Sequence, residues 1–142
     1  MEIPQVGRPY MPGYGIAGPE EGSGLLHWSW AAERLTAARS YWVATVWPDG
    51  RPHVMPVWGM WDDSALWFTS STGSRKVRNL AADPRCCVTT EDASDPVIIE
   101  GIAHFSTETQ VLTETATRLT KQSLAMIADR ADAARAVFKP AA

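Results

Sequence analysis

Cysteine is scarce in this chain of 142 residues, which contains only Cys86 and Cys87. The two residues are adjacent in a predicted strand, so their side chains would point to opposite faces. Adjacent strand residues cannot form an ordinary structural disulfide, and a single pair lacks the spacing of a known metal site. We therefore expect no disulfide and no metal centre, and we interpret both side chains as small apolar groups.

Histidine is also rare, and His27, His53 and His104 lie far apart in the sequence. Neither a Gly-x-Ser-x-Gly nor a His-Glu-x-x-His motif accompanies them, which excludes the hydrolase classes that these motifs mark. The sequence therefore assigns no catalytic side chain. His53 and His104 have two interpretations each, as ordinary strand residues or as groups that contact a ligand.

Long apolar runs and an excess of positive charge are missing as well. No apolar run approaches the roughly 20 residues that span a bilayer, and the N-terminus lacks the charged and apolar segments of a secretory leader. The formal net charge of -3 argues against a general nucleic-acid-binding protein, because such domains carry an excess of Lys and Arg. We expect a cytoplasmic protein with no membrane and no nucleic-acid partner.

The residues that are present indicate one globular domain. Apolar residues make up 45% of the chain and charged residues 20%, and the length is sufficient for a buried core. Much of the proline and glycine falls in residues 1–24, which we interpret as an irregular N-terminal arm. Residues 25–142 form the predicted domain, which ends in a helix.

The elements predicted within this domain form a meander of strands interrupted by helices. Pro48-Asp49-Gly50 is a turn in which glycine takes the corner with positive φ. Pro52 and Pro56 place the following strand at edges or irregular points of the ladder. The predicted strands are residues 41–47, 52–61, 64–70, 85–91 and 97–106. The predicted helices are residues 30–39, capped by Ser29, then 74–82 and about 108–134. This order indicates a small, mostly antiparallel barrel.

Residues 67–80 combine a strand end, a turn rich in hydroxyl groups and the basic start of a helix. Arg75, Lys76 and Arg78 crowd the positive end of the helix dipole, where each costs a few tenths of a kcal/mol, on the order of 0.3. An anionic ligand would reverse this cost, and the helix N-terminus adds free N–H groups. The turn supplies further groups, namely Ser70, Ser71, Thr72, Gly73 and Ser74. Two interpretations follow, an anion-binding cradle or an ordinary Ser-capped helix with solvated cations.

Three segments, in this order, resemble a known superfamily. They are residues 49–58 (DGRPHVMPVW), 66–69 (LWFT) and 74–85 (SRKVRNLAADPR). Across about residues 40–106 the chain resembles the flavin/deazaflavin oxidoreductases, which share the pyridoxamine 5'-phosphate oxidase-like split β-barrel. The resemblance implies a mostly β, antiparallel split β-barrel with helices, and an enzyme in which the cofactor carries the hydride chemistry.

The resemblance also implies a homodimer with a cofactor site between the subunits, binding F420 or FMN together with a small-molecule substrate. By family position, the cofactor-binding residues are Val54, Met55, Pro56, Val57 and Trp58 along the ring, Thr69 and Ser70 near the ribityl chain, and Ser74, Arg75, Lys76 and Arg78 at the phosphate. Two of these residues have a second interpretation besides cofactor binding. Trp58 could instead be a core residue of the barrel, and Arg78 could instead pair with Asp83 or with the partner subunit. Asn79 and Leu80 match structural positions of the family.

The Pro-Val-Trp and Ser-Arg-Lys-x-Arg-Asn-Leu patterns resemble the F420-dependent branch more than the pyridoxamine phosphate oxidases proper. The resemblance thus implies an F420-dependent reductase of a small conjugated substrate. The alternatives are an FMN-binding oxidoreductase and a non-catalytic flavin- or haem-binding protein of the same fold, with His53 or His104 as the haem ligand. Pyridoxamine phosphate oxidase activity is not expected, because the C-terminal arginine and histidine motifs of that enzyme are missing.

Members of this branch end with a further strand after the long helix. Here the chain ends with the residues 136–142 (AVFKPAA), so we expect this strand to be absent or reduced to a stub. Its loss would leave a barrel edge unpaired and the ring pocket partly open. An inactive relative is the corresponding alternative.

Overall fold

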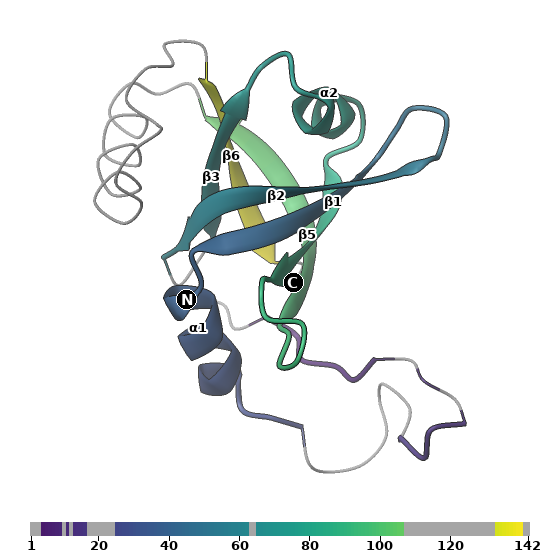
Figure 1. The fold of residues 1–142 in the computed structure, drawn as a ribbon, viewed down its shortest axis with the longest axis vertical. Helices are drawn as coiled ribbons and strands as arrows, with labels where there is room; N and C mark the ends of the chain where they lie inside the picture. Colours follow the sequence, from purple (N-terminus) through teal and green to yellow (C-terminus); the bar gives the residue numbers. More distant parts are fainter. Residues whose placement is uncertain are drawn as a thin grey trace.

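The computed structural model describes residues 4–9, 11, 13–16, 25–62, 65–106 and, for the backbone alone, 133–140. These residues form a closed antiparallel barrel with the strand order β1-β2-β3-β6-β5-β4 (Figure 1). The strands are β1 Ser40–Val46, β2 Pro52–Trp61, β3 Leu66–Ser71, β4 Arg85–Thr90, β5 Ile98–Ser106 and β6 Ala133–Pro140; the helices are α1 Trp28–Ala37 and α2 Arg75–Ala82. The predicted mostly β, antiparallel barrel is confirmed.

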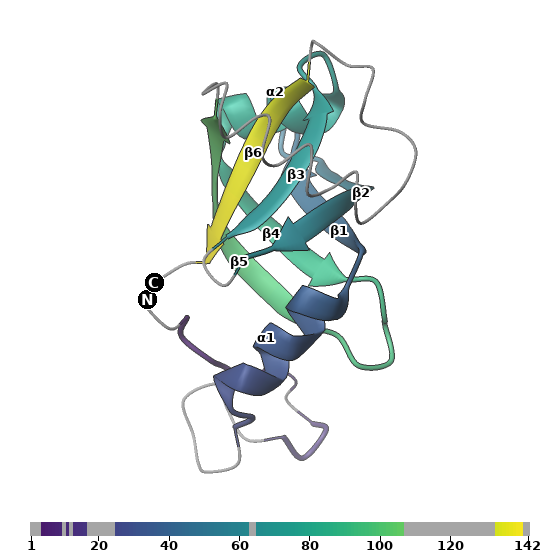
Figure 2. The same ribbon diagram turned by 90° about the vertical axis from the view of Figure 1, so that its left-hand side faces the viewer.

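The C-terminal strand contradicts the expectation from the sequence. β6 lies between β3 and β5 and pairs with both, from Leu66↔Phe138 on one side to Ser106↔Arg135 on the other (Figure 2). The prediction of a missing or rudimentary closing strand was therefore wrong, as was the extension of the last helix to residue 134. Pairing with a strand on each side outweighs the helix propensity of an alanine-rich segment. Residues 108–132 of that predicted helix lie outside the described residues.

The other elements follow the prediction within a few residues, with one different cap. The β1–β2 turn has Gly50 at φ 88°, as predicted. Helix α1 begins at Trp28, earlier than expected, because the cap is His27 and not Ser29: the Nδ1 atom of His27 accepts a hydrogen bond from the backbone N–H of Ser29 at 3.2 Å. An imidazole nitrogen thus replaces the hydroxyl oxygen that the sequence suggested.

Tyr41 connects α1 to the interior of the barrel. Its side chain is fully buried, and its hydroxyl group lies 2.5 Å from the carbonyl oxygen of Leu35 and 3.1 Å from that of Ala38. These carbonyl groups belong to the end of α1, where backbone acceptors lack helical partners. Burial raises the pKa of Tyr41, so the group remains a hydrogen-bond donor at any ordinary pH.

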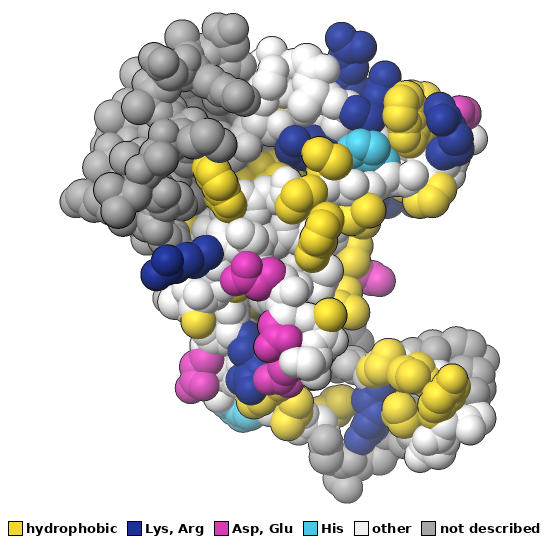
Figure 3. Space-filling view, in the orientation of Figure 1, with side chains coloured by type: hydrophobic (Ala, Val, Ile, Leu, Met, Phe, Trp, Pro, Cys, Tyr) yellow, Lys and Arg dark blue, Asp and Glu magenta, His cyan; other side chains and the backbone are white. Residues whose placement is uncertain are grey.

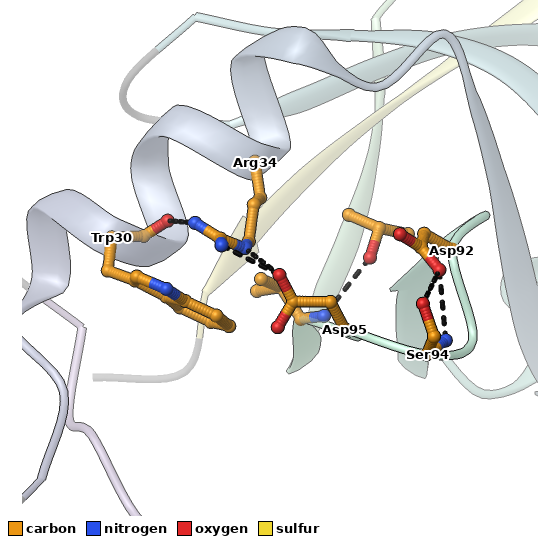
Figure 4. A network of polar contacts seen from close by, with 7 residues as sticks. Trp30, Arg34, Asp92, Ser94 and Asp95 are labelled. Atoms are coloured by element: carbon orange, nitrogen blue, oxygen red, sulfur yellow. Dashed lines mark hydrogen bonds and ion pairs between the residues drawn. The ribbon is translucent and has the colours of Figure 1, made fainter.

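A polar network also holds α1 against the loop between β4 and β5 (Figure 4). The Arg34 guanidinium stacks 3.6 Å above the Trp30 ring, and its Nε donates to the Asp95 carboxylate at 2.7 Å. Together with the buried Leu35, this network places α1 across one end of the barrel (Figure 2).

The two cysteines are free, and both are partly buried in β4. Burial raises the pKa of Cys86 to about 12, and burial also raises the pKa of Cys87. Both thiols are therefore protonated at neutral pH, which agrees with a packing role.

Gly59 of β2 lies against residues of β1 and β3, and the space there admits no side chain. A Cβ atom at this position would lie 3.0 Å from Cδ2 of Tyr41 and 3.1 Å from the carbonyl oxygen of Trp67. We expect Gly59→Ala to lower the free energy of unfolding by about 1–3 kcal/mol, because the strands must separate to admit the methyl group. Urea denaturation measures the change. Gly73→Ala is the matched control, since its Cβ would meet nothing closer than 3.9 Å; equal stability of the two variants would contradict this account.

Candidate functional site

A cavity of about 410 Å³ lies where β2 separates from β3. The two strands pair only from Gly59↔Phe68 to Trp61↔Leu66; beyond this point β3 pairs with β6, and β2 remains paired with β1 alone. The residues that line the cavity come from both sides of this separation: Ser40, Pro56, Val57, Trp58, Thr69, Ser70, Ser71, Ser74 and Lys76. The cavity therefore lies at the split in the barrel.

One wall of the cavity is the free edge of β2. Across the β1–β2 ladder, the backbone N–H of Gly59 donates a hydrogen bond to the carbonyl oxygen of Arg39. At the far end of the hairpin, the backbone N–H of Trp47 donates to the carbonyl oxygen of Arg51. Backbone groups alternate sides along an antiparallel strand, so those of Pro56 and Trp58 point away from β1 and toward the separation. Proline is tolerated at Pro56 because no ladder partner needs its nitrogen. This edge offers the Pro56 carbonyl oxygen and the Trp58 N–H to a planar ligand.

The opposite wall is the turn from β3 into α2. The Ser70 and Ser74 hydroxyl groups lie 2.9 Å apart, and Ser74 caps α2 by accepting the Val77 N–H at 3.4 Å. A serine therefore caps this helix, as one of the two interpretations from the sequence expected, and the helix begins at Arg75, one residue after the predicted start. The N–H groups of Arg75 and Lys76 belong to the first turn, where the helix supplies no carbonyl partner. Hydroxyl groups, free N–H groups and the positive end of α2 therefore meet beside the cavity.

Lys76 is the charged side chain of this wall. It is half-buried, and burial lowers its pKa. Among the described residues the ion pairs join other groups, Arg34–Asp95, Arg51–Asp49 and Arg85–Asp83, and none includes Lys76. A partly desolvated ammonium group without a carboxylate costs free energy. An anionic ligand would provide the missing charge, so the wall fits a phosphate group.

The structure brings most of the predicted cofactor residues together. Pro56, Val57, Trp58, Thr69, Ser70, Ser74 and Lys76 all line the cavity, and sequence reasoning missed Ser40. Ser40 enters the site because it lies opposite Trp58 in the β1–β2 register, a pairing that its own sequence context does not signal. Gly73, in the turn beside the cavity, has no positive φ, and a Cβ atom there would meet only Oγ of Ser71, at 3.9 Å.

Four predicted residues lie outside the cavity lining. Val54 and Met55 are exposed farther along β2. The Arg75 guanidinium lies 3.7 Å above the Trp47 ring, and Arg78 is exposed on α2. The alternative in which Arg78 pairs with Asp83 is not found, because Arg85 binds Asp83 at 2.6 Å and its hydrogen bonds hold the pKa of that carboxyl at about 2.

Trp58 and the two strand histidines each had two interpretations from the sequence, and their positions bear on the choice. Trp58 is 41% exposed and lines the cavity, so its interpretation as a core residue was wrong. His53 is half-buried, with Nδ1 3.4 Å from the Thr45 hydroxyl, and His104 is exposed on β5; neither lines the cavity. Asn79 and Leu80 are buried, as expected of structural residues.

The fold and this site together define a split β-barrel of the kind that binds flavin-type cofactors. Comparison with protein families agrees: the model described as pyridoxamine 5'-phosphate oxidase matches residues 30–142. The chain therefore belongs to this family, within the flavin/deazaflavin superfamily that the sequence motifs resemble. No curated protein matches the chain in sequence.

Solved structures with this fold differ in their ligands. An F420 reductase is 27% identical, with a TM-score of 0.65 over 78% of this chain and 92% of that one. HutZ, the haem storage protein from Vibrio cholerae, is 16% identical (TM-score 0.69; 80% and 89% covered). An FAD-binding protein from Mesorhizobium loti is 19% identical (TM-score 0.66; 82% and 90% covered). The last two show the fold alone.

The described segments give no sign of a membrane span or of a metal centre. Within them, no helix has the length and apolar character needed to cross a bilayer. Over the same residues, no cluster of three or more His, Cys, Asp or Glu side chains is placed to hold a metal ion.

The lowered pKa of Lys76 leads to a prediction about stability. We expect Lys76→Met to raise the free energy of unfolding of the ligand-free protein by up to about 1 kcal/mol at pH 7, because it removes an unpaired charge and retains an apolar stem. The gain should shrink as the pH rises toward the ordinary lysine value of 10.5, since wild-type Lys76 loses its proton in the folded state first. Urea denaturation at both pH values measures this. The control is Arg78→Met on the exposed face; a Lys76→Met protein less stable than wild type at pH 7 would contradict the account.

Proposed function

We propose that this chain is an F420-dependent reductase that transfers a hydride between the deazaflavin and a small conjugated organic substrate. The observation that carries the proposal is the cavity itself. It has a free strand edge on one side and, on the other, a half-buried lysine at a helix N-terminus that forms no ion pair with the described residues. A planar ring with an anionic tail matches both walls. The similarity to an F420 reductase at 27% identity supports the same choice.

Each wall would hold one part of the cofactor. Pro56 and Trp58 would contact the ring through the free backbone groups of β2, and Val57 lies between them in the cavity lining. Thr69 and Ser70 would face the ribityl chain, while Ser74, Lys76 and the first-turn N–H groups of α2 would bind the phosphate. When bound, the deazaflavin supplies the hydride chemistry. The hydroxyl groups of Ser40 and Ser71 lie in the same lining and add further polar contacts.

In this proposal the protein contributes binding and orientation to the reaction. The exposed Trp58 side chain offers an aromatic face beside the ring wall, where a flat conjugated substrate would stack. The edge of β2 and the indole would exclude water from one side of the reacting pair. No side chain among the described lining residues is assigned as a nucleophile, which agrees with chemistry carried by the cofactor.

The charges around α2 favour F420 over FMN. A phosphomonoester needs only the wall at Ser74 and Lys76, whereas Arg75 and Arg78 add two cations that form no ion pair within the described part of the chain. F420 carries carboxylates beyond its phosphodiester and would use this additional charge. Haem ligation is less well supported, since neither His53 nor His104 lines the cavity.

We also propose that two copies of the chain form a homodimer. The outer faces of β1, β2 and β5 expose large apolar side chains, including Trp42 (43%) and Ile98 (63%), which the register places in one row across the sheet with Pro56 and Thr89. Figure 3 shows hydrophobic side chains gathered over the β1–β2 hairpin. A second copy would cover this face and one side of the cavity, where Trp58 is exposed.

We also propose a cytoplasmic location, which the free thiols of the two cysteines fit.

Titration of the purified, cofactor-stripped protein with F420 and with FMN tests the cofactor assignment. Tryptophan fluorescence is the readout, because a ring entering the cavity would lie beside Trp58. We expect F420 to bind more tightly than FMN, and Lys76→Met to weaken F420 binding by about 1.5–3 kcal/mol, on the order of ten- to a hundredfold. Tighter binding of FMN would move the protein to the flavin branch. Unchanged F420 affinity in the variant would remove Lys76 from the phosphate site.

The dimer is tested by Trp42→Glu, which places a charge in the middle of the proposed interface. We expect sedimentation velocity to show a dimer for wild type and a monomer for the variant, since burial of an unpaired carboxylate is costly. Leu26→Glu is the control, because Leu26 is also exposed but precedes α1, away from this face. A dimer that persists in Trp42→Glu would place the interface elsewhere.

A further inference from the structure

The indole of Trp47, at the end of the β1–β2 hairpin, contacts two guanidinium groups. The Arg51 guanidinium lies 4.3 Å from the ring centroid and the Arg75 guanidinium 3.7 Å from it. Arg51 is neutralised by Asp49 at 2.8 Å. Arg75 has no carboxylate partner within the described residues. The stack therefore carries one uncompensated positive charge.

This charge lies away from the cavity, although Arg75 follows Ser74 and precedes Lys76 in the chain. The cavity contacts Ser74 and Lys76 but not Arg75, whose side chain extends to the hairpin. Trp47 lies opposite Arg51 in the ladder, and the strand from there to Trp58 spans about 20 Å. A ligand group bound by Arg75 would therefore lie beyond a phosphate held at Ser74 and Lys76.

The surrounding structure fixes the position of the indole. Two residues before Trp47, the hydroxyl group of Thr45 accepts a hydrogen bond from the Asn79 amide at 3.0 Å, and both side chains are buried. This bond attaches α2 to β1 from inside the barrel. On the other side, the His53 ring meets Trp47 edge-on at 6.2 Å. Helix α2 is thus attached to the hairpin by the Asn79–Thr45 bond and by the Arg75–Trp47 stack, while His53 supports the indole from within the hairpin.

The stacking geometry leaves Arg75 able to bind an anion. A cation–π contact uses the flat face of the guanidinium, whereas its N–H donors lie in the plane and point outward. Because the stack also limits the rotamers of a long side chain, less conformational entropy is lost when a carboxylate binds. An arginine held in this way is prepared for a planar anion.

We propose that Trp47 is a positioning residue, which holds Arg75 to bind a second anionic group of the ligand beyond the phosphate at Ser74 and Lys76. The proposal rests on the proposed function, in which this second group is the glutamate carboxylate tail of F420. Trp47 would thereby set the preference for a ligand with an extended negative charge, without touching the ring or the phosphate.

The test compares two probes, F420 and F420 without its glutamates, which share the ring and the phosphodiester. We expect wild type to bind F420 more tightly by on the order of fivefold, and Trp47→Leu and Arg75→Gln to abolish this preference. Trp47→Phe keeps an aromatic face and should retain most of it. The matched control is Trp30→Leu, which removes the indole under Arg34 at the other end of the barrel and should leave the preference unchanged.

The outcomes separate this inference from the proposed function. If wild type binds both probes with equal affinity, or if Trp47→Leu keeps the wild-type preference, the positioning role is wrong while F420 binding stands. If Trp47→Leu weakens both probes equally, the indole supports the fold and not the second charge, which also overturns the inference. If wild type binds neither probe, both the inference and the proposed function fail.

Discussion

The separation of β2 from β3 beyond Gly59 is the constraint on which the rest of the structure depends. It leaves β2 with a free backbone edge, explains why Pro56 fits inside a barrel strand, and opens the cavity of about 410 Å³. The close approach at Gly59 holds the strands together just before they part. β6 pairs with β3 on its other side and so closes the barrel without closing the cavity. The contact between β2 and β3 at Gly59 and the free edge of β2 beyond it are therefore parts of one arrangement.

The second feature is the positive charge of Arg75 and Lys76, which no carboxylate among the described residues neutralises. Packing and folding alone do not explain it. Helix α2 has no acidic residue in its first turn, and burial lowers the pKa of Lys76 at its N-terminus. The Arg75 guanidinium stacks on the Trp47 ring, which leaves its charge uncompensated, whereas an ion pair would have neutralised it. The basic first turn and the partly desolvated Lys76 cost folding free energy in the ligand-free protein, and both become favourable beside an anion. The start of α2 thus accepts a cost in stability that a bound phosphate would offset.

Much of this was predictable from local sequence, and what was missed depended on distant contacts. Alternating apolar residues, the Pro48-Asp49-Gly50 turn and the Ser74 cap are local signals, and they located β1 to β5 and α2. Pro56 correctly marked an edge. The alanine-rich segment at residues 133–140 forms a strand only because β3 and β5 pair with it, so its own propensity was misleading. The placement of Arg75 on Trp47 likewise depends on a tertiary contact, as does the entry of Ser40 into the cavity through its register with Trp58.

The central claim is that the space between β2 and the start of α2 binds an F420-type cofactor, and a crystal structure of the protein with F420 tests it most directly. The account predicts electron density for the ring beside Pro56 and Trp58, with the phosphate within hydrogen-bonding distance of Ser74 and Lys76. Density for F420 elsewhere on the barrel, with the wall at Ser74 and Lys76 bound only to solvent, would contradict it.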